Sequence, residues 1–212
     1  MDLNKCQIYI RNLNKESYYS KSYIYQEKEY LPDAIKIIEN LKLDKNSKVL
    51  DIGPGWGTLP LWYSYRFNDI TTMDIVPLNH WIKEDFIKEY GIKYIQDSVF
   101  NNIEGEYDLI SMTQVIPHLK WNPLLAIKNI HDALNDNGYF ICCVINNDIY
   151  LNIKSTYGTQ WEKLPDYDTN IAACEDIVTA MYGEKELKEI LGIFREVKIT
   201  KNHCELYAQC RK

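Results

Sequence analysis

The stretch Val49–Gly57 constrains the fold of this chain more than any other part of the sequence, because it reads V-L-D-I-G-P-G-W-G. A short apolar run that stops at closely spaced glycines predicts a β-strand that turns sharply into the next element. Glycine permits a positive φ and lets the backbone approach a ligand without a Cβ in the way. In open α/β sheets, ligands bind beyond the carboxyl ends of the strands. A tight turn without any ligand is the alternative reading of this stretch.

Five apolar runs alternate with segments of helical spacing, which indicates a parallel sheet covered on both faces. We expect strands at residues 48–52, 70–75, 92–95, 108–112 and 139–145, and helices at residues 31–43, 58–67, 78–90, 123–134 and 184–191. Two further strands, near 196–200 and 205–210, are separated by a turn too short for a parallel crossover. The expected fold is therefore an α/β three-layer sandwich, with a mostly parallel seven-stranded sheet, one antiparallel edge strand and helices on both faces.

The length of 212 residues suits a single domain. Residues 1–30 are polar and rich in tyrosine, and we expect them to form an N-terminal arm. Residues 146–182 lack a simple period, and we expect an insertion on the substrate side of the domain.

Composition and charge narrow the classes of partner. The net charge is −6 and no basic stripe is visible, which argues against a nucleic-acid substrate. No apolar run is long enough to span a bilayer, and the N-terminus does not resemble a signal peptide. The six cysteines include no C-x-x-C pair, so we expect no metal site and free thiols in a soluble cytoplasmic protein. The oligomeric state is open.

The glycine spacing separates two kinds of nucleotide site. A dinucleotide fingerprint requires G-x-G-x-x-G, whereas Gly53, Gly55 and Gly57 form G-x-G-x-G, and Thr58 takes the place of the third glycine. We expect Thr58 to cap the following helix. With Asp51, the turn resembles the D/E-x-G-x-G-x-G loop of the class I S-adenosylmethionine-dependent methyltransferases. An NAD-linked oxidoreductase on a similar sheet is the rival that this spacing opposes.

Two later strand ends extend the resemblance. Thr71-Thr72-Met73-Asp74-Ile75 ends the second strand in an acid, and the family places an acid there to bind the ribose. Tyr94-Ile95-Gln96-Asp97-Ser98 ends the third strand in an acid that, in the family, accepts from the adenine amino group. The alternative reading of each aspartate is a turn former, which for Asp74 taken alone is the more frequent role.

The fourth strand and its extension, Tyr107–Leu119, resemble the corresponding family segment. The resemblance implies that Thr113 and Gln114 lie beside the sulfonium, and it makes His118 a candidate general base or a structural histidine. The turn Asn135–Gly138 departs from the family's L-x-P-G-G, which affects turn geometry rather than cofactor chemistry. The cofactor-binding set implied by the resemblance is Asp51, Gly53, Pro54, Gly55, Trp56, Gly57, Asp74, Ile75, Asp97, Ser98, Thr113 and Gln114.

Aromatic side chains are the candidates for contact with the acceptor, although aromatic residues also serve ordinary packing. They are Tyr18, Tyr19 and Tyr23 in the arm, and Tyr157 and Trp161 in the insertion. Five acids of the insertion favour either a cationic amine substrate or a solvated surface: Glu162, Asp166, Asp168, Glu175 and Asp176.

The resemblance implies methyl transfer from S-adenosyl-L-methionine, with S-adenosyl-L-homocysteine as the product. The single-domain size and the acidic net charge favour a small-molecule acceptor over RNA or DNA. The expected acceptor is a hydroxyl of a sugar or another metabolite. Two alternatives stay open: N-methylation of a small amine, and a catalytically silent protein that only binds the cofactor.

Overall fold

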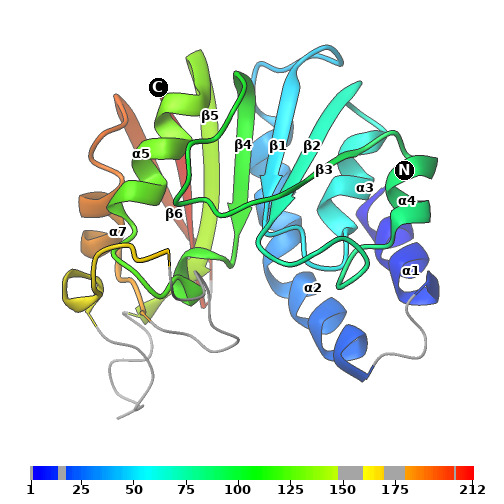
Figure 1. Ribbon diagram of the computed structural model, residues 1–212, viewed down its shortest axis with the longest axis horizontal. Coiled ribbons are helices and arrows are strands. Elements are labelled where there is room, and N and C mark those ends of the chain that lie inside the picture. Colours follow the sequence, from blue (N-terminus) through cyan, green and yellow to red (C-terminus); the bar gives the residue numbers. More distant parts are fainter. Residues whose placement is uncertain (1, 14–17, 148–159, 170–179, 203) are drawn as a thin grey trace. The chain divides into compact units, whose positions relative to one another are not determined.

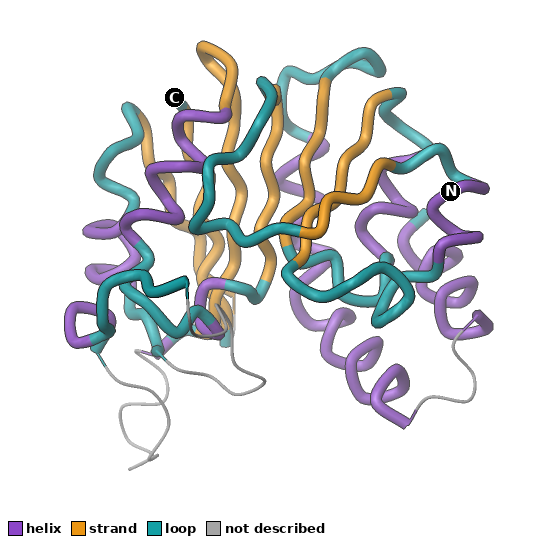
Figure 2. The backbone as a smooth tube through the Cα atoms, in the orientation of Figure 1, coloured by secondary structure: helices purple, strands orange, loops and turns teal. Residues whose placement is uncertain are grey.

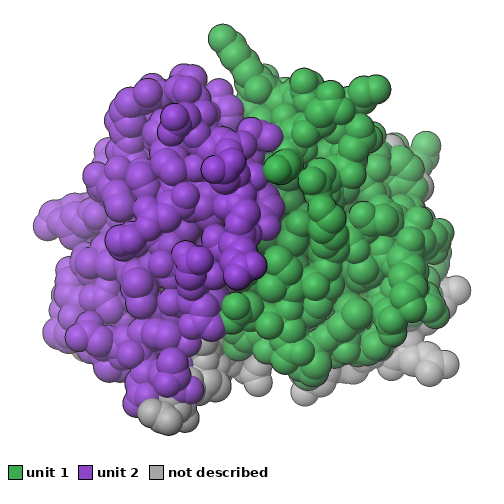
Figure 3. Space-filling model, turned by 45° about the horizontal axis from the view of Figure 1, so that its top comes forward, with its two compact units in different colours: residues 1–97 green, residues 98–212 purple. Residues whose placement is uncertain are grey.

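The computed structural model describes residues 2–13, 18–147, 160–169, 180–202 and 204–212 (Figure 1). The chain divides into two compact units, Met1–Asp97 and Ser98–Lys212, which Figure 3 colours green and purple. Each unit has its own arrangement of strands and helices.

The first unit contains four helices and three strands among its described residues. The helices are α1 (Leu3–Leu13), α2 (Tyr18–Glu39), α3 (Thr58–Ser64) and α4 (Glu84–Glu89). The strands are β1 (Lys48–Ile52), β2 (Asp69–Asp74) and β3 (Lys93–Gln96). The strands lie side by side in the order β3-β2-β1, as part of the orange strands of Figure 2. Both pairs are parallel. Their carboxyl ends therefore share one edge.

The second unit begins after β3 and holds the remaining strands. Its strands are β4 (Tyr107–Thr113), β5 (Leu134–Ile145), β6 (Glu196–Asn202) and β7 (Glu205–Arg211). Its described helices are α5 (Leu124–Ala133), α7 (Glu184–Ile190) and the short 3-10 helices η1 (Ile116–His118) and η2 (Trp161–Lys163). Strands β4 and β5 are parallel, whereas β7 is antiparallel to both β5 and β6.

The strand order β3-β2-β1-β4-β5-β7-β6 confirms the expected α/β class with a mostly parallel seven-stranded sheet. The antiparallel strand is β7, which pairs with β5 on one side and with β6 on the other. The apolar runs that predicted the strands are buried: Val49 and Leu50 of β1 and Cys142 and Cys143 of β5 have no exposed surface.

The N-terminal residues differ from the expected arm, because most of them are helical. Helix α2 begins at Tyr18 rather than Leu31 and ends at Glu39, with Pro32 inside it instead of in its first turn. Helix α1 buries Cys6 and Ile10. The expected boundary failed because a tyrosine-rich segment with few aliphatic residues hides its helical spacing.

Two further elements depart from the expected bounds. Helix α4 starts at Glu84, not at residue 78, because Asn79 has a φ of 75° and interrupts any helix there. Strand β5 starts at Leu134, and its register against β4 shifts between Tyr107 and Leu109. The expected turn at Asn135–Gly138 is this irregularity, where Asn137 has a φ of 65°.

Candidate functional site

The glycine turn follows β1 directly and is held to β2. Gly53, Gly55 and Gly57 have φ values of 68°, 52° and 93°, all in the region that favours glycine. The Gly53 amide donates to the Met73 carbonyl at 2.9 Å, and the Gly57 amide donates to the Pro54 carbonyl at 3.0 Å. The backbone of the turn is therefore fixed against the strand that ends at Asp74.

Besides its positive φ, Gly57 is closely surrounded by neighbouring side chains, which leave no space for a Cβ. A Cβ at this position would lie 2.9 Å from Cδ1 of Ile82 and 3.2 Å from Cε1 of Phe86. The third glycine thus allows close packing of the turn against the start of α4. This packing accounts for Gly57 without any ligand.

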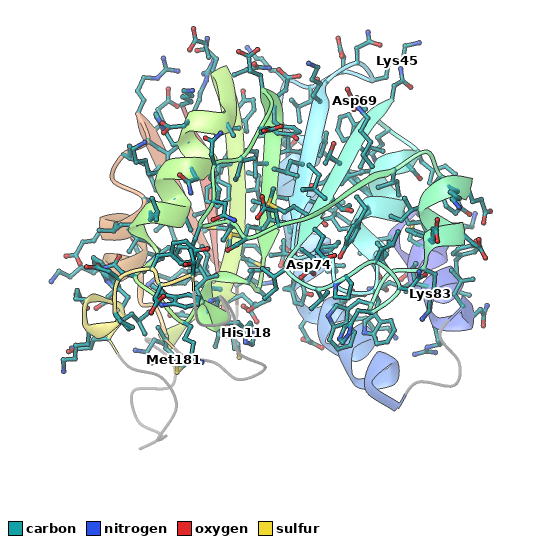
Figure 4. The ribbon with its side chains drawn as sticks, viewed as in Figure 1. Lys45, Asp69, Asp74, Lys83, His118 and Met181 are labelled. Carbon is teal, nitrogen blue, oxygen red and sulfur yellow. The ribbon has the colours of Figure 1, made fainter. Side chains whose placement is uncertain are left out.

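Asp74 is the last residue of β2 and lies at the carboxyl end of the strand, opposite Asp69 (Figure 4). Burial raises the pKa of Asp74, while hydrogen bonds from the Val76 and Ile75 amides and the nearby His80 oppose that rise. The Val76 amide to Asp74 Oδ1 distance is 3.3 Å. A half-buried carboxylate with these few partners is suited to accept further hydrogen bonds.

Asp97 follows β3 and comes next to Asp74. Its amide donates to the Asp74 carbonyl at 3.0 Å, which continues the β2–β3 pairing of Asp74 with Gln96. Within the first unit, the structure thus brings the glycine turn, Asp74 and Asp97 to one edge of three parallel strands. This is the set that the sequence predicted there.

An aromatic cluster that the sequence did not predict lies next to this edge. Trp56, inside the glycine turn, contacts Trp81 edge to face at 5.2 Å between ring centroids, and Trp81 contacts His80 at 4.5 Å. Trp56 is buried, whereas Trp81 is half-buried and His80 is exposed. The missed signal is the neighbouring pair His80-Trp81, which lies in the segment between β2 and α4.

The expected cap at Thr58 is wrong. The residue before α3 is Gly57, and the helix has no side-chain cap. Thr58 is fully buried, and its hydroxyl donates to Oε2 of Glu27 at 2.7 Å. Glu27 belongs to α2, within the residues expected to form an arm, so its partnership with the glycine turn was missed.

The second unit carries the other predicted cofactor residues. Ser98 opens it, and its side chain accepts from the Phe100 amide at 3.3 Å. Thr113 ends β4 beside Cys143, and Gln114 follows with a φ of 56°. A non-glycine residue in this conformation is strained, and such strain is often found at functional sites.

Gln114 is held by two partners from other strands of its unit. Its amide donates to the Cys143 carbonyl at 2.9 Å, and its side-chain nitrogen donates to Glu205 Oε2. Glu205 opens β7 and was not among the predicted site residues. An acid after a short turn between two strands gives no sequence signal for such a role.

His118 ends the 3-10 helix η1, and its side chain is half-buried. The Ala180 amide donates to the Pro117 carbonyl at 3.2 Å, which brings the end of the insertion beside η1. Met181 follows on that segment, as Figure 4 shows. The structure thus places His118 in the second unit next to residues of the expected substrate side.

The predicted aromatic contacts are described only in part. Tyr157 lies outside the described residues, and the backbone of Tyr18, Tyr19 and Tyr23 is helical in α2 while their side chains lie outside the description. Trp161 opens η2 and is half-buried. Its segment is anchored on the second unit: the Asn122 amide donates to the Pro165 carbonyl at 2.9 Å, and Tyr167 stacks on Phe100 at 5.0 Å.

The described acids of the insertion agree with a solvated surface, because Glu162, Asp166 and Asp168 are all exposed. Glu175 and Asp176 lie outside the described residues.

The described cysteines of β5 are not suited to act as nucleophiles, because burial raises the pKa of the Cys142 and Cys143 thiols. Cys174 lies outside the described residues. No helix among the described residues is long and apolar enough to cross a membrane.

Residues 23–191 match the protein family described as "Methyltransferase domain". The chain belongs to this methyltransferase family. The matched range contains the glycine turn, Asp74, Asp97 and the Thr113–His118 segment, and it confirms the resemblance that the sequence motifs carried.

Known proteins agree with this assignment. A sphingolipid C9-methyltransferase of Candida albicans (strain SC5314 / ATCC MYA-2876) is 29% identical over 113 residues, which are 47% of this chain. The match covers 22% of that relative's own length, so the two proteins differ greatly in extent.

Two solved structures share the fold at low sequence identity. The complex of DhpI with SAH has a TM-score of 0.65 at 15% identity and covers 99% of this chain and 96% of the other. The Burkholderia thailandensis 1,6-didemethyltoxoflavin-N1-methyltransferase, with 1,6-didemethyltoxoflavin and S-adenosylhomocysteine bound, has a TM-score of 0.64 at 17% identity, over 100% of this chain and 91% of the other.

Proposed function

We propose that this chain transfers the methyl group of S-adenosyl-L-methionine to a small-molecule acceptor. The observation that carries the proposal is the first unit's edge, where the glycine turn, Asp74 and Asp97 end three successive parallel strands. The family assignment and the bound cofactor products of the two solved neighbours support the same reading.

The residues of this edge fit the parts of the cofactor in order. Asp74 is half-buried with few partners and can accept from both ribose hydroxyls, while Asp97 at the next strand end can accept from the adenine amino group. Gly53 and Gly55 leave the end of β1 without side chains, which admits the remaining methionine portion. Pro54, Trp56, Ile75 and Ser98 complete the proposed wall of the site.

When bound, the cofactor supplies the reactive methyl group, carried on a positively charged sulfur. The protein then has to bind and orient, and alignment alone can contribute about 7–11 kcal/mol. Gln114 and Thr113 are the proposed neighbours of the sulfur. Gln114 is suited to a fixed position, because backbone and side-chain hydrogen bonds hold it in its strained conformation.

We propose a hydroxyl of a sugar or another metabolite as the acceptor, with His118 as the general base that takes its proton. A small amine is the second candidate acceptor. It is favoured by Glu205, whose carboxylate lies against Gln114 and would attract a cation. Both acceptors have to lose a proton: an amine attracted as a cation must be deprotonated before its nitrogen can attack the methyl group, and a hydroxyl must be deprotonated as its oxygen attacks.

The test is transfer of a labelled methyl group from S-adenosyl-L-methionine to pools of small hydroxylated metabolites and small amines, with S-adenosyl-L-homocysteine measured as the second product. In one pool we expect labelled acceptor and S-adenosyl-L-homocysteine in equal amounts. His118→Ala should lower turnover of a hydroxyl acceptor by about 10²–10⁴-fold. Near-normal turnover of His118→Ala would exclude the base, and cofactor binding without transfer to any pool would favour the silent alternative.

A further inference from the structure

Glu27 is an acid in a place where acids are rarely found. Its side chain is 3% exposed, and it lies on the apolar stripe of α2 that also includes Leu31, Ala34 and Ile38. Acidic side chains are almost never buried to this degree unless they are paired. The described structure offers its carboxylate one hydrogen bond, from the Thr58 hydroxyl at 2.7 Å.

No charged group of the described residues compensates Glu27. Burial raises its pKa to about 7, and the Thr58 hydrogen bond is the one influence that lowers it. Among the side chains that the structure describes on α1, α2 and α3, none besides Thr58 acts on the pKa of Glu27. A buried carboxylate without a compensating charge either stays protonated or binds a cation.

The position of Glu27 relates it to the glycine turn. Thr58, its partner, directly follows Gly57 and is the first residue of α3. Glu27 is therefore tied to the end of β1 by way of one fully buried side chain. The other two strand ends of the unit, at Asp74 and Asp97, lie on β2 and β3.

The strand order then fixes which part of the cofactor would meet Glu27. Adenine at Asp97 and ribose at Asp74 leave the methionine portion for the end of β1, because the strands lie in the order β3-β2-β1. The methionine portion carries a primary ammonium group. We propose that Glu27 recognises this ammonium, as an ion-pairing residue supplied by α2 beside the glycine turn. The inference rests on the proposed function.

Proton release is the consequence that separates this role from a structural one. The ammonium favours the ionised carboxylate, so binding near pH 7 drives a proton from Glu27 to the buffer. A Glu27 that only holds Thr58 in place would keep its proton throughout. S-adenosyl-L-homocysteine is a suitable probe, because it keeps the ammonium and lacks the sulfonium charge.

The test is calorimetric titration of S-adenosyl-L-homocysteine into the full chain at pH 7, in buffers of different ionisation enthalpy. We expect wild type to release a substantial fraction of a proton per site. E27Q retains an oxygen that can accept from Thr58 but cannot ionise, so it should release less. Its affinity should fall by about ten- to a hundred-fold, as for loss of a hydrogen bond to a charged group.

Two controls make the outcome specific. Glu29→Gln removes an exposed acid from the same helix and should behave as wild type. 5′-Methylthioadenosine lacks the ammonium, so E27Q and wild type should bind it equally. Equal affinity and equal proton release for S-adenosyl-L-homocysteine in E27Q and wild type would overturn the role of Glu27. Failure of wild type to bind either ligand would instead overturn the proposed function.

Discussion

At the scale of single residues, the glycine turn combines two requirements that the sequence alone could not separate. Gly57 needs its positive φ, and the space for its Cβ is taken by Ile82. Gly91 also has a positive φ, of 62°, but nothing lies within 4 Å of its Cβ position. Comparing substitutions at Gly57 and Gly91 therefore separates the cost of backbone strain from the cost of steric contact.

Gly57→Ala should lower the free energy of unfolding by about 2–4 kcal/mol, because strain at a positive φ and overpacking both contribute. Gly91→Ala should cost about 1 kcal/mol, since it carries the backbone strain alone. Urea unfolding of both variants measures the difference. Equal losses would contradict the steric contribution of Ile82 at the glycine turn.

Glu27 predicts a pH dependence of stability in the absence of cofactor. Its pKa rises from 4.5 to about 7 on folding, so its favourable contribution is full below pH 4.5 and is lost as the pH rises through 7. By pH 8 the loss approaches about 3 kcal/mol relative to acid conditions. We expect E27Q to lack this loss when unfolding is followed from pH 5 to pH 8. Parallel pH profiles for E27Q and wild type would contradict the buried, uncompensated carboxylate.

At the scale of elements, the sequence predicted most strands because buried apolar runs bounded by turn residues have few other interpretations. The runs at Val49–Ile52 and Ile141–Ile145 are strands as expected. Helices with weak apolar spacing were predicted less well. Helix α2 was missed upstream of Leu31 because aromatic and charged residues fill most of its first turns.

The candidate site was predictable where one motif carries several residues. The glycine turn, Asp74 and Asp97 each lie at the carboxyl end of a strand, and strand ends are readable from a single sequence. Glu27 and Glu205 were not predictable, since their roles depend on contacts between segments far apart in the chain. An acid on an apolar helix face indicates a buried carboxylate. This signal was not readable here, because the predicted helix began at Leu31 and did not include Glu27.

At the scale of the whole molecule, each of the two compact units carries some of the proposed contact residues. The first unit holds the glycine turn, Asp74, Asp97 and Glu27, which are the proposed contacts for adenosine and the ammonium. The second unit holds Thr113, Gln114, His118 and Glu205, which are the proposed contacts for the sulfur and the acceptor. Membership in the methyltransferase family applies across both, because the matched residues run from 23 to 191.

The measurement that tests the central claim most directly is calorimetric binding of S-adenosyl-L-methionine to wild type, Asp74→Asn and Asp69→Asn. Asp69 lies at the opposite end of β2 in an exposed pair with Lys93, so Asp69→Asn should bind as wild type. Asp74→Asn should bind at least about tenfold more weakly, because a hydrogen bond to a charged acceptor is lost. Equal binding by all three proteins, or binding of NAD in place of S-adenosyl-L-methionine by wild type, would contradict the account.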